Sequence, residues 1–264
     1  LMQRGRLRHL LVAGFLTTAV PSASGESADA PPAPPPRRSL GLGVSHEVLS
    51  NNQPSWQSLY LLGSWQDADR RSFYGGVRET TRYDRRDSEA HLGGALLLTS
   101  GTHLLVEAGF SPSHQVLPAR YGYVGLQQQL AREWSLTAGF RRAFYDSGQA
   151  RVASLGLEHY TGNERFAYTL YLGAPDGAPL AGSHRWQWAH YYGDRDWFGL
   201  TLIHGRETEN LGATGLQTLK SRGELVSGRH GIAADWALVW EVGSIELGDF
   251  HRRRGIRLGL SHAF

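Results

Sequence analysis

From Leu40 to the last residue, the sequence repeats short runs in which apolar and polar side chains alternate, and no segment sustains a helical period. In the final run, RRRGIRLGLSHAF, alternate positions carry Ile256, Leu258 and Leu260, with charged or small residues between them. The pattern therefore predicts an all-β chain with an even number of strands. The fourteen runs lie at about 40–49, 55–66, 71–82, 87–98, 103–111, 120–130, 134–145, 150–160, 165–173, 183–192, 197–208, 216–229, 236–247 and 253–264.

The connections between these runs fall into two alternating classes. One class is short and polar, as in TSGT (99–102) and TGNE (161–164), and the other is often longer, as in SPSHQVLPA (111–119). Bacterial outer-membrane barrels have short periplasmic turns and longer outer loops, and eleven residues tilted by about 40° rise roughly 28 Å, enough to cross the apolar band. We therefore predict a transmembrane, antiparallel, up-and-down β-barrel. It would have fourteen strands, or twelve if the first hairpin is peripheral, and both termini on the periplasmic side.

Aromatic residues separate a membrane barrel from a soluble β-sandwich, because alternation alone fits both folds. Amphipathic rings favour the membrane interface, so a barrel should carry them at both ends of its strands. One row, at the short turns and the C-terminus, includes Trp65, Trp134, Trp197, Trp236 and Phe264. A second row, beside the longer loops, comprises Trp56, Tyr83, Tyr121, Tyr145, Trp186 and Phe250. The strand that ends at Phe264 also resembles the signal by which the barrel-insertion machinery recognises outer-membrane proteins.

The sequence of the N-terminal region predicts an export signal followed by a tether. Residues 1–25 combine three arginines, the uncharged apolar run 10–20 and small residues, which is typical of a Sec signal peptide. Residues 26–39 are proline-rich and predict an extended periplasmic tether, so the barrel domain should cover 40–264. The chain has no cysteine and therefore no disulfide framework. These features predict a location in the cell outer membrane.

Composition excludes several other classes. No stretch approaches the roughly 20 apolar residues of a membrane-spanning helix. The isoelectric point is about 9.3, but the basic residues are scattered without a recognition motif, so we do not expect nucleic-acid binding. The twelve histidines are spread over different runs without metal-ligand spacing, and we expect neither a metal site nor a cofactor.

Two sets of residues are candidates for function. Polar residues on the lumen side would either line an aqueous pore or pair within a filled barrel, because a charge facing lipid near the midplane costs about 2–4 kcal/mol. A serine and histidine set on two outer loops either forms a hydrolase dyad or caps the loops. The pore-lining candidates are Arg78, Glu107, Arg141, Glu158, Arg206 and Glu241, and the hydrolase candidates are Ser111, Ser113, His114, Ser183 and His184.

Several longer segments resemble the YaiO family of outer-membrane β-barrel proteins. They include VSHEVLSNNQPSW (44–56), SPSHQVLPARY (111–121), SHRWQWAHYYGDR (183–195), GRETENLG (205–212) and RRGIRLGLSHAF (253–264). The resemblance implies an outer-membrane location and leaves the activity poorly defined. Some longer relatives join a similar barrel to periplasmic helical repeats or occur alongside polysaccharide machinery.

We therefore expect a passive or export pore for small or saccharide solutes. The alternatives are a non-conducting structural or surface-recognition barrel and an outer-membrane lipid-modifying hydrolase. The expected partners are outer-membrane lipid and lipopolysaccharide, the barrel-insertion machinery and a saccharide polymer.

Overall fold

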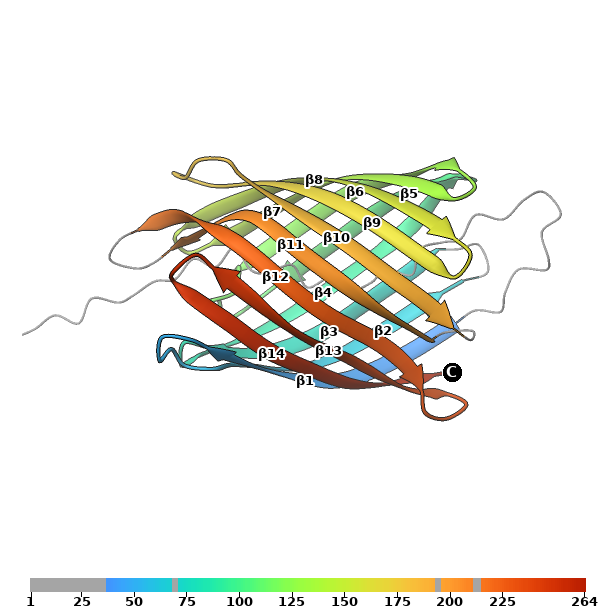
Figure 1. Cartoon of the computed structure of the whole chain (residues 1–264), viewed down its shortest axis with the longest axis horizontal. Coiled ribbons are helices and arrows are strands. Elements are labelled where there is room, and N and C mark those ends of the chain that lie inside the picture. Colours follow the sequence, from blue (N-terminus) through green and yellow to red (C-terminus); the bar gives the residue numbers. More distant parts are fainter. Residues whose placement is uncertain (1–36, 68–70, 193–195, 211–214) are drawn as a thin grey trace, which may run out of the picture.

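The computed structural model describes residues 37–67, 71–192, 196–210 and 215–264, and these residues form one closed, antiparallel barrel of fourteen strands (Figure 1). Within these ranges no helix has the length and apolar character needed to cross a membrane. The strands are β1 (Arg37–Leu49), β2 (Trp56–Gln66), β3 (Ser72–Arg82), β4 (Arg85–Thr99), β5 (Thr102–Phe110), β6 (Arg120–Ala131), β7 (Trp134–Tyr145), β8 (Gly148–Thr161), β9 (Glu164–Pro175), β10 (Ala181–Tyr192), β11 (Asp196–Asn210), β12 (Leu216–Gly231), β13 (Trp236–Leu247) and β14 (His251–Ala263).

Each strand pairs with its neighbour in sequence, and β1 closes the barrel against β14 in a ladder that runs from Ser39 opposite Ala263 to Leu49 opposite Arg253. Closure leaves no unpaired sheet edge, which is what a β-structure needs in a bilayer. The prediction of fourteen strands is confirmed, and the first hairpin belongs to the wall. β1 begins at Arg37, so the end of the predicted tether joins the first strand. The predicted signal peptide lies outside the described residues.

The two ends of the barrel differ. One end, here called the terminal end, carries the start of β1 and the C-terminus, where the Phe264 amide donates to the Arg38 carbonyl at 3.0 Å. The opposite end carries the β1–β2, β5–β6 and β13–β14 loops and is called the loop end. In Figure 1 the C-terminus lies at the right, so the loop end is at the left.

The strand register divides the side chains between an outer face and the lumen. Large apolar residues on the outer face are well exposed, among them Leu42, Val124 and Leu258 at 55%, 49% and 42%. Charged residues in the middle of the strands, such as Glu107 and Arg141, occupy the other parity. An apolar exterior around a polar interior is the arrangement that a lipid environment requires.

Three tryptophans of the aromatic row predicted for the terminal end lie on the outer face of the barrel. Trp65, Trp134 and Trp236 project outward with 38–45% exposure. Trp65 stacks on Phe73, and Phe264 is 73% exposed beside the last strand.

Trp197 departs from this row. It lies opposite Arg229 on the lumen side, while its neighbour Phe198 faces outward. The prediction for Trp197 is therefore wrong, because two adjacent aromatic residues left the parity of this strand ambiguous.

The predicted second girdle is wrong for most of its members. Trp56 and Tyr121 point inward, with 2% and 7% exposure, whereas Trp186 is outward and 43% exposed. Arginines mark the outer face at this edge instead, and their long stems reach from the apolar band to water. They are Arg120, Arg142, Arg151, Arg222, Arg252 and Arg254.

Candidate functional site: the barrel lumen

A network centred on Glu107 occupies the lumen wall between β3 and β7. The Tyr74 hydroxyl donates to Glu107 Oε2 at 2.6 Å, and Arg141 Nη1 lies 3.5 Å from Oε1. The same guanidinium lies over the Tyr121 ring, 3.7 Å from its centroid. The carboxylate is therefore neutralised and held in place by residues from neighbouring parts of the wall.

Four further pairs of lumen charges also follow the wall. Each pair joins adjacent strands, so its side chains run around the circumference and do not cross the interior. The pairs are Arg78 with Glu89 at 3.0 Å, Arg165 with Glu158 at 2.5 Å, Arg257 with Glu241 at 3.6 Å and Arg253 with Glu47 at 3.7 Å.

Inward tyrosines lean sideways over glycines. At Gly109, a side-chain Cβ would lie only 2.2 Å from Cε1 of Tyr121, so only glycine leaves room for the ring. The rings consequently lie along the wall. The glycine and tyrosine pairs are Gly43 with Tyr60, Gly93 with Tyr74, Gly109 with Tyr121 and Gly139 with Tyr123.

The loop end of the lumen contains a buried aromatic and arginine cluster. Trp56 lies under two guanidinium groups, those of Arg82 at 4.5 Å and Arg253 at 4.7 Å from a ring centroid. Tyr83, in the turn between β3 and β4, packs edge-on against Trp56 with the centroids 5.3 Å apart, and burial raises the pKa of its phenol. The indole thus joins β2 to the ends of β3 and β14.

The β5–β6 loop, residues 111–119, is anchored inside the mouth. Asp87 on β4 points into the barrel and is fully buried. Its carboxylate accepts the backbone N–H groups of Gln115, Val116 and Leu117 at 3.0, 2.7 and 2.8 Å. Three donors on one carboxylate hold this segment against the inner wall.

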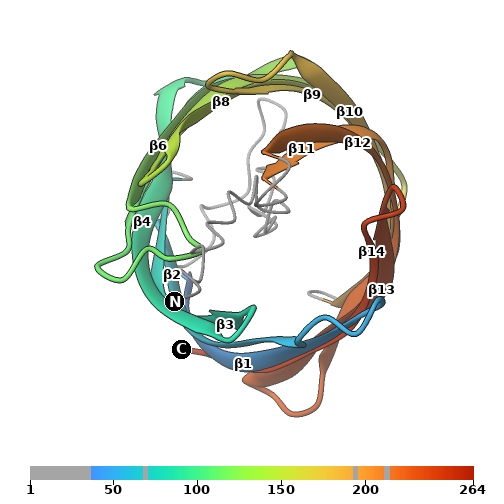
Figure 2. The same ribbon diagram turned by 90° about the vertical axis from the view of Figure 1, so that its left-hand side faces the viewer.

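A second element narrows the mouth. The β11–β12 arm, residues 206–210 and 216–220, continues as a two-stranded ladder beyond the pairing of β11 with β10 and of β12 with β13. In Figure 2, a view along the barrel, β11 and β12 turn inward from the wall. Thr208 and Glu209 are 2% and 5% exposed, so the arm is packed in place. The mouth is consequently narrower than the barrel behind it.

Most of the predicted pore-lining residues face the lumen: Arg78, Glu107, Arg141, Glu158 and Glu241. Arg206 does not, because it lies opposite Lys220 on the same exposed face as Leu202. This error has the same origin as that for Trp197. In β11 the residues expected to face outward face the lumen, and those expected to face the lumen face outward.

The serine and histidine candidates do not form a dyad. The Ser111 hydroxyl donates to the Ser88 carbonyl at 2.6 Å. His114 uses both ring nitrogens elsewhere, Nδ1 with the Ser111 carbonyl at 3.1 Å and Nε2 with Asp146 at 2.9 Å. A general base needs a nitrogen facing the nucleophile, and neither nitrogen faces a hydroxyl here.

The remaining hydrolase candidates are also placed in structural roles. Ser113 Oγ accepts the Ser88 amide at 3.1 Å. Ser183 faces the lumen from β10, whereas His184 faces outward and contacts the Tyr168 hydroxyl at 2.7 Å. This geometry favours the interpretation that the serine and histidine candidates cap the loops.

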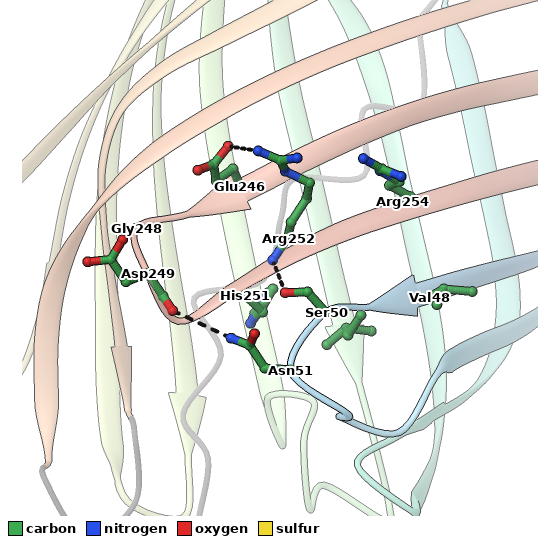
Figure 3. Close-up of a pocket in the computed structure, with 10 residues that line it drawn as sticks. Val48, Ser50, Asn51, Glu246, Gly248, Asp249, His251, Arg252 and Arg254 are labelled. Atoms are coloured by element: carbon green, nitrogen blue, oxygen red, sulfur yellow. Dashed lines mark hydrogen bonds and ion pairs between the residues drawn. The ribbon is translucent and has the colours of Figure 1, made fainter.

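A groove of about 510 Å³ lies outside the lumen, between the β1–β2 loop and the β13–β14 turn (Figure 3). Asn51 Nδ2 donates to the Phe250 carbonyl at 2.6 Å, and Ser50 Oγ accepts the Arg252 amide at 2.8 Å. Arg252 pairs with Glu246 at 2.9 Å, so acidic and basic side chains are balanced in this groove.

Sequence reasoning missed Asp87, and it placed Trp56 in an interfacial row and so missed its role in the lumen. Asp87 interacts with main-chain amides, which leave no pattern of residue types in the sequence. The only signal for Trp56 was its place on the lumen parity of its strand, shared with Tyr60.

The family model of the YaiO membrane beta barrel domain matches residues 37–210, more than half of the chain. Among solved structures, the chain is similar to the CymD monoaromatic hydrocarbon channel, with TM-score 0.53, 10% identity and coverage of 87% of this chain and 88% of that one. It is similar to a bacterial polysaccharide outer membrane secretin, with TM-score 0.51, 9% identity and coverage of 86% and 98%. Salmonella typhi OmpF follows with TM-score 0.50, 8% identity and coverage of 86% and 97%.

At these identities the likeness to solved structures concerns the fold. The comparison with curated proteins gives no match. The family model covers the first eleven strands of a closed barrel with an apolar exterior and a charged lumen. The chain therefore belongs to the YaiO family of membrane β-barrels and is a protein of the outer membrane.

Proposed function

We propose that this barrel is a passive pore for small polar or saccharide solutes. The observation that carries the proposal is the course of the lumen side chains: charged pairs follow the wall, and tyrosine rings lie over glycines. A barrel that its own lumen side chains fill needs side chains that meet across its axis, and these side chains do not. The loop end would face outward and the terminal end the periplasm, as in other outer-membrane barrels.

The chemistry of the lining favours hydroxyl-rich solutes. Flat rings offer apolar faces for stacking, and the neighbouring guanidinium and carboxylate groups offer hydrogen-bond donors and acceptors. Eight of the eleven tyrosines lie on the lumen parity: Tyr60, Tyr74, Tyr121, Tyr123, Tyr145, Tyr160, Tyr171 and Tyr191.

Planar-bilayer conductance of the refolded protein tests the proposal, with Glu107→Gln and Arg141→Gln as variants. A unit charge about 5 Å from an ion in water contributes roughly 0.8 kcal/mol, which corresponds to about fourfold in relative permeability. We expect discrete steps whose selectivity moves toward anions in Glu107→Gln and toward cations in Arg141→Gln. Glu79→Gln is the matched control, because Glu79 pairs with Arg86 on the outer face.

Silence from a barrel whose heat-modifiable gel migration shows that it is folded would overturn the pore. If Glu79→Gln changed the ion selectivity as much as the two test variants do, the test residues would not act from the lumen.

A further inference from the structure

Three arginines on the outer face of β6, β7 and β8 form a basic cluster, here called the arginine triad: Arg120, Arg142 and Arg151. Arg142 and Arg151 lie directly opposite each other in the β7–β8 ladder. Like charges in this position destabilise a sheet unless an opposite charge lies nearby.

The triad has more positive charge than its surroundings neutralise. Arg151 pairs with Asp176 at 2.8 Å, and Arg142 Nε donates to Gln149 at 2.7 Å. The Arg151 hydrogen bond keeps the pKa of Asp176 below its usual range, so this carboxylate is ionised and supplies one negative charge. Among the residues that the structure describes, Arg120 and Arg142 form no ion pair.

Phe144 contacts two of these guanidinium groups. The groups of Arg120 and Arg142 each lie 4.9 Å from the centroid of its ring. Cation–π contacts fix their positions without neutralising their charge. The cluster is thus ordered while its outward-facing nitrogens remain available to an anion.

The position of the triad matches a lipid headgroup layer. Arg142 lies eight residues along β7 from the girdle residue Trp134, a rise of roughly 20 Å for a tilted strand. The outer face between them is apolar, with Phe140, Leu126 and Leu155 exposed at 43–49%. A phosphate bound to the triad would therefore sit at the edge of the apolar band.

We propose that the arginine triad binds the phosphate groups of lipopolysaccharide, whose acyl chains lie along the apolar strip below. Guanidinium groups match phosphate geometry in two-pronged hydrogen bonding, and an added anion relieves the repulsion between Arg142 and Arg151. The net positive charge of the arginine triad distinguishes it from the groove of Figure 3. In that groove two acidic residues, Glu246 and Asp249, offset Arg252 and Arg254. The proposal does not depend on pore function.

The test measures how lipopolysaccharide protects the folded barrel in phosphatidylcholine vesicles, using the temperature at which gel migration changes. We expect the triple variant Arg120→Gln, Arg142→Gln, Arg151→Gln to need at least tenfold more lipopolysaccharide for half-maximal protection. Arg252→Gln, which removes one paired arginine at the same edge, should leave the midpoint unchanged. If the triple variant does not fold, the charge reversal Arg142→Glu replaces it, with the same expectation.

Two further ligands separate the sources of phosphate. Dephosphorylated lipopolysaccharide and inorganic phosphate should each protect at least tenfold more weakly than intact lipopolysaccharide. Equal protection by the dephosphorylated lipid, equal protection by inorganic phosphate, or an unchanged midpoint in the arginine variants would each overturn the proposal.

Discussion

Asp87→Ala is expected to lower the free energy of unfolding by about 3–5 kcal/mol and to release the β5–β6 loop from the mouth. The substitution removes the acceptor shared by three backbone N–H groups. Val116 and Leu117 are 2% and 1% exposed, so their amides would remain buried without partners. Each unsatisfied buried donor costs about 1–3 kcal/mol, and the loop regains part of this only by moving into water.

Two measurements check this prediction. The midpoint temperature of heat-modifiable gel migration should fall, and the single-channel conductance should become noisier or larger. Asp84→Asn is the control, because Asp84 is exposed in the neighbouring turn at a positive φ of 57° that asparagine tolerates. Asp87→Asn keeps one acceptor oxygen and should fall between the two. A wild-type midpoint in Asp87→Ala would show that the loop is held by its apolar contacts alone.

The course of the strands was predictable because its determinants are local. The two-residue period and the polar turns placed strands at 134–145 and 236–247, the bounds that β7 and β13 have in the structure. The parity of β11 was not predictable in the same way. Trp197 and Phe198 are adjacent and both aromatic, so either could face lipid, and only pairing with β10 and β12 decides between them.

The lumen charges were largely predictable, and the mouth was not. A charge in a membrane strand must avoid lipid, which places Glu107 and Arg141 inward from parity alone. The loop anchor at Asp87 joins residues 28 to 30 positions apart through main-chain amides. The predicted outer girdle failed because an aromatic residue near a loop can face either way. At this edge Trp56 faces the lumen, where it supports two arginines.

Trp56→Ala is the second substitution with a large expected effect, a loss of at least about 4 kcal/mol in the free energy of unfolding. Removing a buried aromatic side chain costs about 3–5 kcal/mol, and each cation–π contact adds about 0.5–2 kcal/mol when desolvated. Trp56 is 2% exposed and contacts both Arg82 and Arg253. In the part of the chain that the structure describes, Arg253 pairs with Glu47 and Arg82 forms no ion pair, so without the ring the buried Arg82 guanidinium would lose its aromatic partner.

Trp56→Phe separates the two parts of this effect. Among the described residues the indole Nε1 has no hydrogen-bond partner. The substitution by phenylalanine therefore reduces the buried area and weakens the π face but removes no hydrogen bond. We expect it to recover more than half of the stability lost in Trp56→Ala, measured by urea unfolding in vesicles. Recovery in Trp56→Leu equal to that in Trp56→Phe would contradict the cation–π role, because leucine restores apolar volume without a π face. The three variants thus show whether the mouth is held by packing alone or by the pairing of arginines with an aromatic ring.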